Sequence, residues 1–375
     1  MKRFGIIGGV FLLAACNRSA PPPPIQKPNV LLITIDTLRA DRVGRGLTPA
    51  IDGLAARGVR FTGARTTAPL TLPSHTSIMT GTRPPENGVR VNGATLATRP
   101  TLARAFQGAG YRTGAFVGAY VLDRRFGLSG GFDTYDDRVQ RDPSGAARLE
   151  AERRGDIVVD AALQWLGSGD GKPFFAWVHL YDPHAPYNPP QEFLAKAGGN
   201  AYDGEVAFAD AQVGRLLDWL RTSGQAGRTI IALAGDHGEG LGEHGELTHG
   251  MLAYDSTLRV PLVIVFPAQG GRYQIPKGDS RSLRLEAAGT TDPRPVSLAD
   301  LAGTLLHAAG LPVPAGMGEG PLGGGREAYA ETEYPRTAGW HSLAALAFDQ
   351  WKLVLSSKAE LYDVTSDPGE TRNLA

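Results

Sequence analysis

Apolar residues along this chain follow two spacings, one typical of buried strands and one typical of amphipathic helices. Nearly continuous apolar runs predict strands buried on both faces at residues 30–35, 174–180 and 229–234. Apolar positions at helical spacing, with capping residues at their ends, predict helices at residues 50–57, 205–222 and 298–309. Strands that alternate with helices favour an α/β fold with a mostly parallel sheet covered on both faces.

The last fifty residues have a different pattern. Three short apolar stretches with tight links predict neighbouring strands at residues 342–348, 351–355 and 360–364. We therefore expect a small antiparallel subdomain at the C-terminal end of the same fold.

The N-terminal residues form a targeting segment rather than part of the fold. Lys2 and Arg3 precede an apolar stretch at residues 6–15 that is too short to span a bilayer. Leu13-Ala14-Ala15-Cys16 then resembles the bacterial lipobox, in which the Cys is lipidated. We expect an exported lipoprotein anchored to a membrane through Cys16, on the periplasmic side. The alternative is an ordinary signal peptide with an incidental Cys.

The residues after Cys16 fit a membrane tether. Residues 17–28 contain four consecutive Pro residues and predict a stiff spacer. Asn17 is not the Asp that resembles an inner-membrane retention signal, which favours the outer membrane. The predicted organisation is a signal peptide, a Pro-rich linker, a catalytic domain and a small C-terminal subdomain, at residues 1–16, 17–28, 29–325 and 326–375.

Composition narrows the class of partner. The 38 basic and 38 acidic side chains give a formal net charge of zero, and no basic run stands out, so we expect no nucleic-acid partner. The single Cys excludes an internal disulfide framework. The sequence does not indicate an oligomeric state.

Acidic and imidazole side chains follow the predicted strands where these strands end. Asp36 directly follows the first strand, Asp236 and His237 follow the third, and His184 lies shortly after the second. Open α/β sheets place their sites at the carboxyl ends of strands, so we expect these side chains to meet around a divalent metal. Taken singly, each also has a structural interpretation, since Asp caps turns and His serves in packing.

The segment at residues 236–250 is harder to explain structurally. It holds three His, three Glu and five Gly in fifteen residues, which does not fit a regular element with a buried face. Loops this polar are costly to order without a ligand or metal. Six of the eight His residues fall in or beside the polar segments: His75, His179, His184, His237, His244 and His249.

A second group of polar residues surrounds Thr71. Pro73 fits the first turn of a helix and Gly81 fits its end, so we expect Thr71 just outside the helix N-terminus, where anions are favoured. A hydroxyl there could be activated by a metal and attack a phosphate or sulfate group. Alternatively, Thr71 simply caps the helix.

These segments together resemble the sulfatases of the alkaline-phosphatase-like superfamily, over nearly all of the mature chain. The resemblance lies in Pro28-Asn29-Val30 with Asp36-Thr37-Leu38-Arg39-Ala40-Asp41, Thr71-Leu72-Pro73-Ser74-His75 with Met79-Thr80-Gly81, Ala234-Gly235-Asp236-His237-Gly238, and Leu361-Tyr362-Asp363 with Asp367-Pro368-Gly369-Glu370. It implies an α/β/α sandwich and a metal-dependent hydrolase of anionic esters.

The chain departs from the sulfatase pattern at four places. Thr71 stands where sulfatases carry the Cys or Ser that is oxidised to formylglycine, and His75 stands where they carry Arg. Residues 118–121 lack the Lys and His of the corresponding sulfatase segment, and Thr37 replaces the second of two paired Asp residues. Oxidised Thr would be a ketone rather than an aldehyde, so sulfatase elimination chemistry is not expected here.

An unmodified Thr resembles the phosphodiesterase-like and phosphoethanolamine-transferase branches of the superfamily. That resemblance implies that Asp36, Thr71, Asp236 and His237 hold a divalent metal. The ligand types leave Zn, Mn and Ca open, because calcium prefers oxygen ligands whereas the nearby imidazoles favour Zn or Mn.

By the same resemblance, His184 and His249 would bind the transferred group, protonate the leaving group or hold a second metal, and His75 would belong to the catalytic set. The expected function is hydrolysis of sulfate or phosphate esters with Thr71 as nucleophile. The alternatives are a sulfuric ester hydrolase with another nucleophile, an inactive anion-binding lipoprotein, and a head-group transferase.

Overall fold

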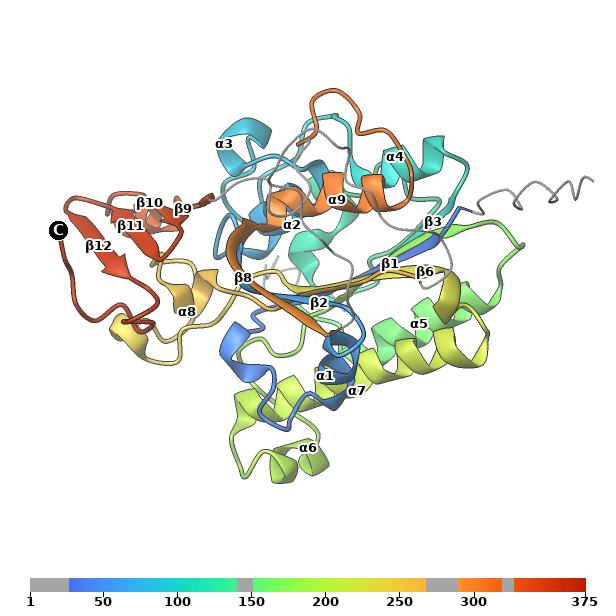
Figure 1. The fold of residues 1–375 in the computed structure, drawn as a ribbon, viewed down its shortest axis with the longest axis horizontal. Coiled ribbons are helices and arrows are strands. Elements are labelled where there is room, and N and C mark those ends of the chain that lie inside the picture. The colour runs from blue at the N-terminus through green and yellow to red at the C-terminus, as the bar shows by residue number, and fades with distance from the viewer. Residues whose placement is uncertain (1–26, 140–150, 268–288, 319–326) are drawn as a thin grey trace, which may run out of the picture.

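The computed structural model describes residues 27–139, 151–267, 289–318 and 327–375, and it shows a central sheet between two layers of helices (Figure 1). The sheet has eight strands in the order β4-β3-β5-β1-β6-β7-β2-β8. Their bounds are β1 Asn29–Ile35, β2 Val59–Arg65, β3 Arg112–Val117, β4 Thr134–Asp136, β5 Phe174–Leu180, β6 Thr229–Gly235, β7 Leu262–Val265 and β8 Thr290–Ser297. All neighbours are parallel except that β7 runs antiparallel to β6 and β2. The predicted α/β fold with a mostly parallel sheet is confirmed.

The three predicted strands form the centre of this sheet. β1 lies between β5 and β6, and all three are buried along their whole length. Such burial on both faces explains why their sequences are apolar without alternation.

Helices cover the two faces of the sheet. Leu31 and Ile33 of β1 pack toward α1, α5 and α7, whereas Val30 and Leu32 pack toward α2, α4 and α9, because side chains alternate along a strand. The helix bounds are α1 Pro49–Ala55, α2 Thr71–Thr80, α3 Pro84–Asn87, α4 Leu102–Gly108, α5 Gly155–Gly167, α6 Gln191–Lys196, α7 Ala201–Thr222, α8 Asp255–Leu258 and α9 Leu301–Ala308. None of the helices in the described ranges combines the length and apolarity that crossing a bilayer requires.

Helix α2 begins earlier than its sequence indicates. Thr71 is its first residue and Leu70 its N-cap, which corrects the expectation that Thr71 lies just outside the helix. Pro73 is tolerated at the third position because the first amides of a helix have no acceptor within it. Gly81 ends the helix with a φ of 69°, as predicted.

A second, antiparallel sheet lies at the C-terminal end of the molecule, at the left of Figure 1. Its strands are β9 Glu327–Thr332, β10 Leu343–Phe348, β11 Trp351–Leu355 and β12 Ala359–Asp363, in the order β12-β11-β10-β9. The three predicted strands and their antiparallel arrangement are confirmed, and β9 is a fourth strand that the sequence analysis did not identify. Cys16, the signal peptide, residues 17–26 and the predicted boundary at residues 325–326 lie outside the described residues.

Candidate active site

Two buried carboxylates lie side by side at the carboxyl edge of the central sheet. Asp36 follows β1 and Asp236 follows β6, and because these strands are parallel neighbours, their ends meet. The Asp36 amide donates to the carbonyl of Leu180 at 2.9 Å, and the Asp236 amide donates to that of Ile35 at 3.2 Å. Neither residue is exposed to solvent. The two carboxyls are therefore fixed by the sheet itself.

His237 and Thr71 complete this group. The Nδ1 atom of His237 lies 3.0 Å from the carbonyl of Gly238, which can only accept, so Nδ1 carries the proton and Nε2 has a free lone pair. That lone pair lies 3.4 Å from Asp36 Oδ1 and 3.6 Å from Asp236 Oδ2. Thr71 Oγ1 lies 3.3 Å from both Asp36 Oδ2 and His237 Nε2. The four residues expected to hold a metal thus meet at one point, and the Thr71 hydroxyl faces this group rather than capping α2.

The chemistry of this group fits a bound cation. Asp36, Asp236 and His237 form a cluster whose ligand atoms lie within 4.8 Å of one another. Asp36 Oδ1 and Asp236 Oδ2 are buried without a hydrogen-bond partner, and within the described ranges no Lys or Arg pairs with either carboxylate. Two such carboxylates facing an imidazole lone pair need positive charge between them.

The pKa shifts at this site follow from burial and from the neighbouring charges. Burial raises the pKa of Asp236 well above its usual range, and the charge of Asp36 adds to the rise. Burial opposes ionisation of Asp36 as well, but the neighbouring imidazoles, His179 above all, hold the pKa of Asp36 below its usual range. Burial lowers the pKa of His237 to about 3, so this imidazole is neutral and able to bind a metal.

Thr37 shows why the missing second Asp of the sulfatase pattern matters. Its hydroxyl donates to the carbonyl of Pro183, and its amide donates to Asp236 Oδ1 at 3.2 Å. The Thr37 amide therefore orients the Asp236 carboxylate, whereas the Thr37 hydroxyl is bound to the carbonyl of Pro183. The candidate metal group, Asp36, Asp236 and His237, therefore has one carboxylate fewer than the sulfatase pattern that the sequence resembles.

His75 lies beneath the nucleophile candidate and is fully buried. Trp177 Nε1 donates to Thr34 Oγ1 at 2.9 Å, so the Thr34 hydroxyl is directed toward His75 Nε2, also at 2.9 Å. His75 Nδ1 then carries the proton and donates to the Thr71 carbonyl at 2.8 Å. Burial lowers the pKa of His75 well below its usual value, which keeps the ring neutral. This geometry fits a residue that positions Thr71 rather than one that contacts substrate.

His179 is a neighbour of the site that the sequence analysis did not assign to the catalytic or metal residues. It lies on β5 and is completely buried; the Gly118 amide donates to its Nδ1 at 3.4 Å, which directs Nε2–H toward Asp36 Oδ2, also at 3.4 Å. The sequence placed a His within the strand but gave no sign that its ring turns toward the edge of the sheet.

Two further imidazoles lie beside the metal group. The rings of His249 and His237 are 4.5 Å apart, and those of His249 and His184 are 5.1 Å apart. His184 stacks on Tyr181 at 4.3 Å and donates from Nδ1 to the carbonyl of Ala185. Burial lowers the pKa of His184, so its Nε2 is a neutral acceptor.

His249 has the opposite character because of Glu239. Its Nδ1 lies 2.9 Å from Glu239 Oε1, and Glu239 is fully buried and also accepts from the Tyr187 hydroxyl at 2.9 Å. Burial opposes the charged form of His249, but the hydrogen bond and charge of Glu239 raise its pKa. A protonated His249 beside a neutral His184 is suited to donating a proton.

The fold and this site define a class of α/β hydrolases that act on anionic esters with the help of a metal. Within that class the chain belongs to the sulfatase family, because the family model described as Sulfatase matches residues 28–311.

Relatives and solved structures agree with this assignment. The uncharacterized sulfatase YidJ of Escherichia coli is 26% identical, with 93% of this chain and 83% of the relative covered. The choline-sulfatase of Rhizobium meliloti is also 26% identical, with 93% and 82% covered. The phosphonate monoester hydrolase of Agrobacterium radiobacter has a similar fold, with a TM-score of 0.71, 24% identity, and 93% and 91% covered. A protein solved with its substrate D-glucosamine-2-N,6-O-disulfate gives a TM-score of 0.74 at 21% identity, with 93% of both chains covered. The chain is therefore an ester hydrolase of a metal-dependent family.

Proposed function

We propose that this protein hydrolyses sulfate or phosphate esters with the Thr71 hydroxyl as nucleophile. The observation that carries the proposal is the position of Thr71 Oγ1, 3.3 Å from both Asp36 Oδ2 and His237 Nε2. Asp36, Asp236 and His237 would hold a divalent cation, which lowers the pKa of a neighbouring hydroxyl and offsets the charge that develops on the transferred group.

The side chains supply the remaining steps. The Thr71 hydroxyl proton departs toward Asp36 Oδ2, which accepts its hydrogen bond, as Thr71 Oγ1 bonds to the sulfur or phosphorus atom. The ester bond to the leaving group breaks, and His249 supplies the proton that the departing oxygen takes up. Water then cleaves the threonyl ester and releases the inorganic anion. His184 accepts a hydrogen bond from the substrate or this water.

Of the two possible substrate classes, phosphate esters suit an unmodified Thr71 nucleophile better than sulfate esters do. A threonyl phosphate ester is hydrolysed at phosphorus by water, whereas a sulfuryl group on Thr lacks the elimination route that an aldehyde hydrate provides. The family assignment supports sulfate esters, and the similar fold of a phosphonate monoester hydrolase supports phosphorus chemistry.

A substrate panel tests the proposal. The chain without residues 1–16 is treated with a chelator and assayed on p-nitrophenyl sulfate, p-nitrophenyl phosphate and bis-p-nitrophenyl phosphate, before and after addition of Zn, Mn or Ca. We expect ester hydrolysis that depends on added metal. Absence of turnover on all three esters with every metal would instead favour an anion-binding protein without catalysis.

We also propose that the enzyme is a membrane-anchored, exported lipoprotein. The support is the lipobox-like Leu13-Ala14-Ala15-Cys16 and the Pro-rich residues 17–28 that follow. Cys16→Ser should move the protein from the membrane fraction to the soluble fraction of a bacterial host. An unchanged distribution would contradict the anchor.

A further inference from the structure

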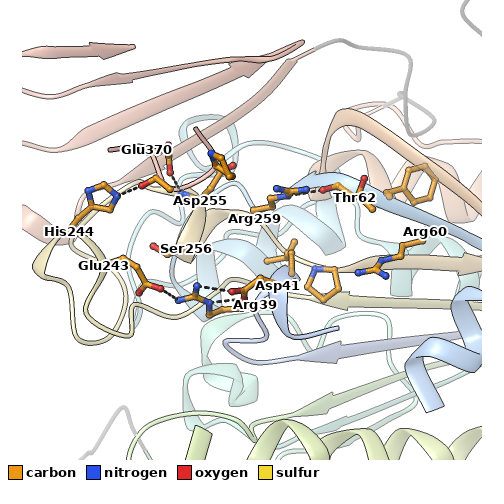
Figure 2. A pocket seen from close by; sticks show the side chains of 16 residues that line it. Arg39, Asp41, Arg60, Thr62, Glu243, His244, Asp255, Ser256, Arg259 and Glu370 are labelled. Carbon is orange, nitrogen blue, oxygen red and sulfur yellow. Dashed lines mark hydrogen bonds and ion pairs between the residues drawn. The ribbon is translucent and has the colours of Figure 1, made fainter. Parts of the chain in front are cut away.

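The structure contains a cavity that none of the proposed catalytic or metal residues line (Figure 2). Its volume is about 460 Å³, and it lies among the loop after β1, strand β2, helix α8 and the C-terminal segment around Glu370. Arg39, Arg60 and Arg259 line it, and Figure 2 shows their side chains around the same space.

Two of these arginines have unused donors. Arg259 donates from Nε to the Thr62 carbonyl at 2.8 Å, and Arg60 donates from Nη2 to the Val43 carbonyl at 3.3 Å. Across the described residues neither guanidinium forms an ion pair, and both are only partly exposed. Each therefore presents a charge and free N–H groups to the cavity.

The acidic residues of the cavity already lie in ion pairs. Arg39 pairs through Nε with Asp41 at 2.9 Å and through Nη1 with Glu243 at 2.8 Å, and Arg45 lies 3.8 Å from Asp41 as a second cation.

On the opposite wall, Asp255 and Glu370 share the buried Lys352, at 2.9 and 2.7 Å, and Asp255 also pairs with Arg65 at 2.6 Å. Among the described residues, Arg60 and Arg259 are the cations of this cavity that have no acidic partner.

We propose that this cavity is a second anion site, which takes a tetrahedral oxyanion between Arg60 and Arg259. A sulfate or phosphate oxygen pair matches the fork of a guanidinium, and partial burial strengthens the attraction. The anion is either free in solution or a second charged group on a larger substrate.

The cavity has a direct structural connection to the active site. Arg39 Nη1 donates to the carbonyl of Glu239 at 3.0 Å, and the side chain of Glu239 binds His249. An anion bound beside Arg39 would therefore act on the segment that holds the proton donor.

Binding is tested without turnover, so this proposal and the proposed function can fail separately. The chain without residues 1–16 is titrated with sodium sulfate at constant ionic strength, and its crystals are soaked in selenate, whose anomalous signal locates the ion. We expect a selenate peak within hydrogen-bond distance of Arg259. In the double variant Arg60→Gln/Arg259→Gln, which keeps amide donors, sulfate binding at the cavity should weaken at least tenfold.

Arg57→Gln is the matched control, because Arg57 also donates to a backbone carbonyl but is exposed and does not line the cavity. No selenate peak in the cavity, or equal sulfate affinity in the double variant and this control, would overturn the proposal.

Kinetics then distinguish the source of the anion. If the site takes a group on the substrate, the double variant should raise KM for a disulfated disaccharide and leave KM for p-nitrophenyl sulfate unchanged. If it takes the free ion, KM should change for neither substrate while the selenate peak is still lost.

Discussion

At the scale of single residues, the site depends on where protons lie. Nδ1 of His237 and Nδ1 of His75 both donate to backbone carbonyls, which fixes the tautomer of each ring. His237 then offers a lone pair to the same space as two buried carboxylates. A divalent cation bound there would remove the repulsion between the two carboxylates, so we expect metal affinity and catalysis to be lost together.

Asp236→Asn should separate metal binding from folding. The amide oxygen can still accept from Thr37 N and His237 N, but one of the two buried charges is gone. We expect hydrolysis to fall at least about 100-fold, and the metal-free variant to melt at a higher temperature than the metal-free parent. Thermal melts with and without metal check this; a variant that retains both activity and metal-induced stabilisation would remove Asp236 from the metal set.

Trp177→Phe should reveal the positioning role of His75. Without the indole donor, the Thr34 hydroxyl is no longer held in the orientation in which it donates to His75 Nε2, so the His75 ring keeps its tautomer but is held less firmly beneath Thr71. We expect kcat to fall about tenfold with KM nearly unchanged and a stability loss of about 1 kcal/mol. Trp165→Phe is the control, because no hydrogen bond of the Trp165 indole is found among the described residues. Equal kcat in the two variants would contradict the positioning role of His75.

At the scale of elements, apolar patterning predicted the central strands of the large sheet well, but it missed β9, the edge strand of the small sheet. Residues 174–180 match β5 at both ends, and residues 229–234 fall one short of β6. Strand β9 was not predicted, since two of its four buried positions are Ala and its sequence contains two Glu residues. Burial of Glu331 depends on its pairing with Arg90 from a distant segment, which no local pattern reveals.

In the candidate site, too, the residues that could be predicted are those marked by their local sequence, and the others depend on contacts between distant segments. Asp36, Asp236 and His237 could be predicted because they directly follow strands. Glu239 and His179 could not be assigned roles, because their contacts with His249 and Asp36 arise only when separate strands and loops meet.

The C-terminal sheet is joined to the main domain by a buried ion network. Lys352 on β11 is fully buried and binds Asp255 of α8 and Glu370 of the C-terminal segment. Lys352→Met would leave these carboxylates short of a partner, at a cost of about 3–5 kcal/mol. Denaturant unfolding, with the exposed Lys358→Met as control, measures the difference. A loss of less than about 1 kcal/mol would show that the network is not essential.

At the scale of the whole molecule, stability should depend on pH through buried carboxyls. Burial raises the pKa of Asp300, beside α9, to about 7, whereas the unfolded value is 3.8. The folded state then binds the proton more tightly, so this group's contribution to stability is complete below about pH 4 and is lost as the pH rises through about 7.

Asp300→Asn should remove this dependence. The stability of the variant relative to the parent should increase by about 1–3 kcal/mol between pH 4 and pH 8. We expect a value in the lower part of this range, because the Asp300 carboxyl stays partly accessible to solvent. Unfolding curves at several pH values test this against Asp349→Asn, which changes an exposed turn. Parallel curves for the two variants would contradict the shift.

The whole fold also explains why the Thr71 hydroxyl faces the buried Asp and His side chains. Topology brings residues 36, 71 and 236 together from three separate segments, and α2, which is buried along its entire length, fixes Thr71 at this point. Thr76 lies on the same helix, equally buried, but forms no hydrogen bond through its hydroxyl within the described structure. It is therefore a matched control for the loss of a buried Thr hydroxyl.

The most direct test compares ester hydrolysis by Thr71→Ala and Thr76→Ala in the presence of the activating metal. If Thr71 is the nucleophile, its variant should lose at least about 1,000-fold in kcat while still binding metal, and the Thr76 variant should keep most activity. Turnover by Thr71→Ala at the level of Thr76→Ala, on either sulfate or phosphate esters, would contradict the proposed nucleophile.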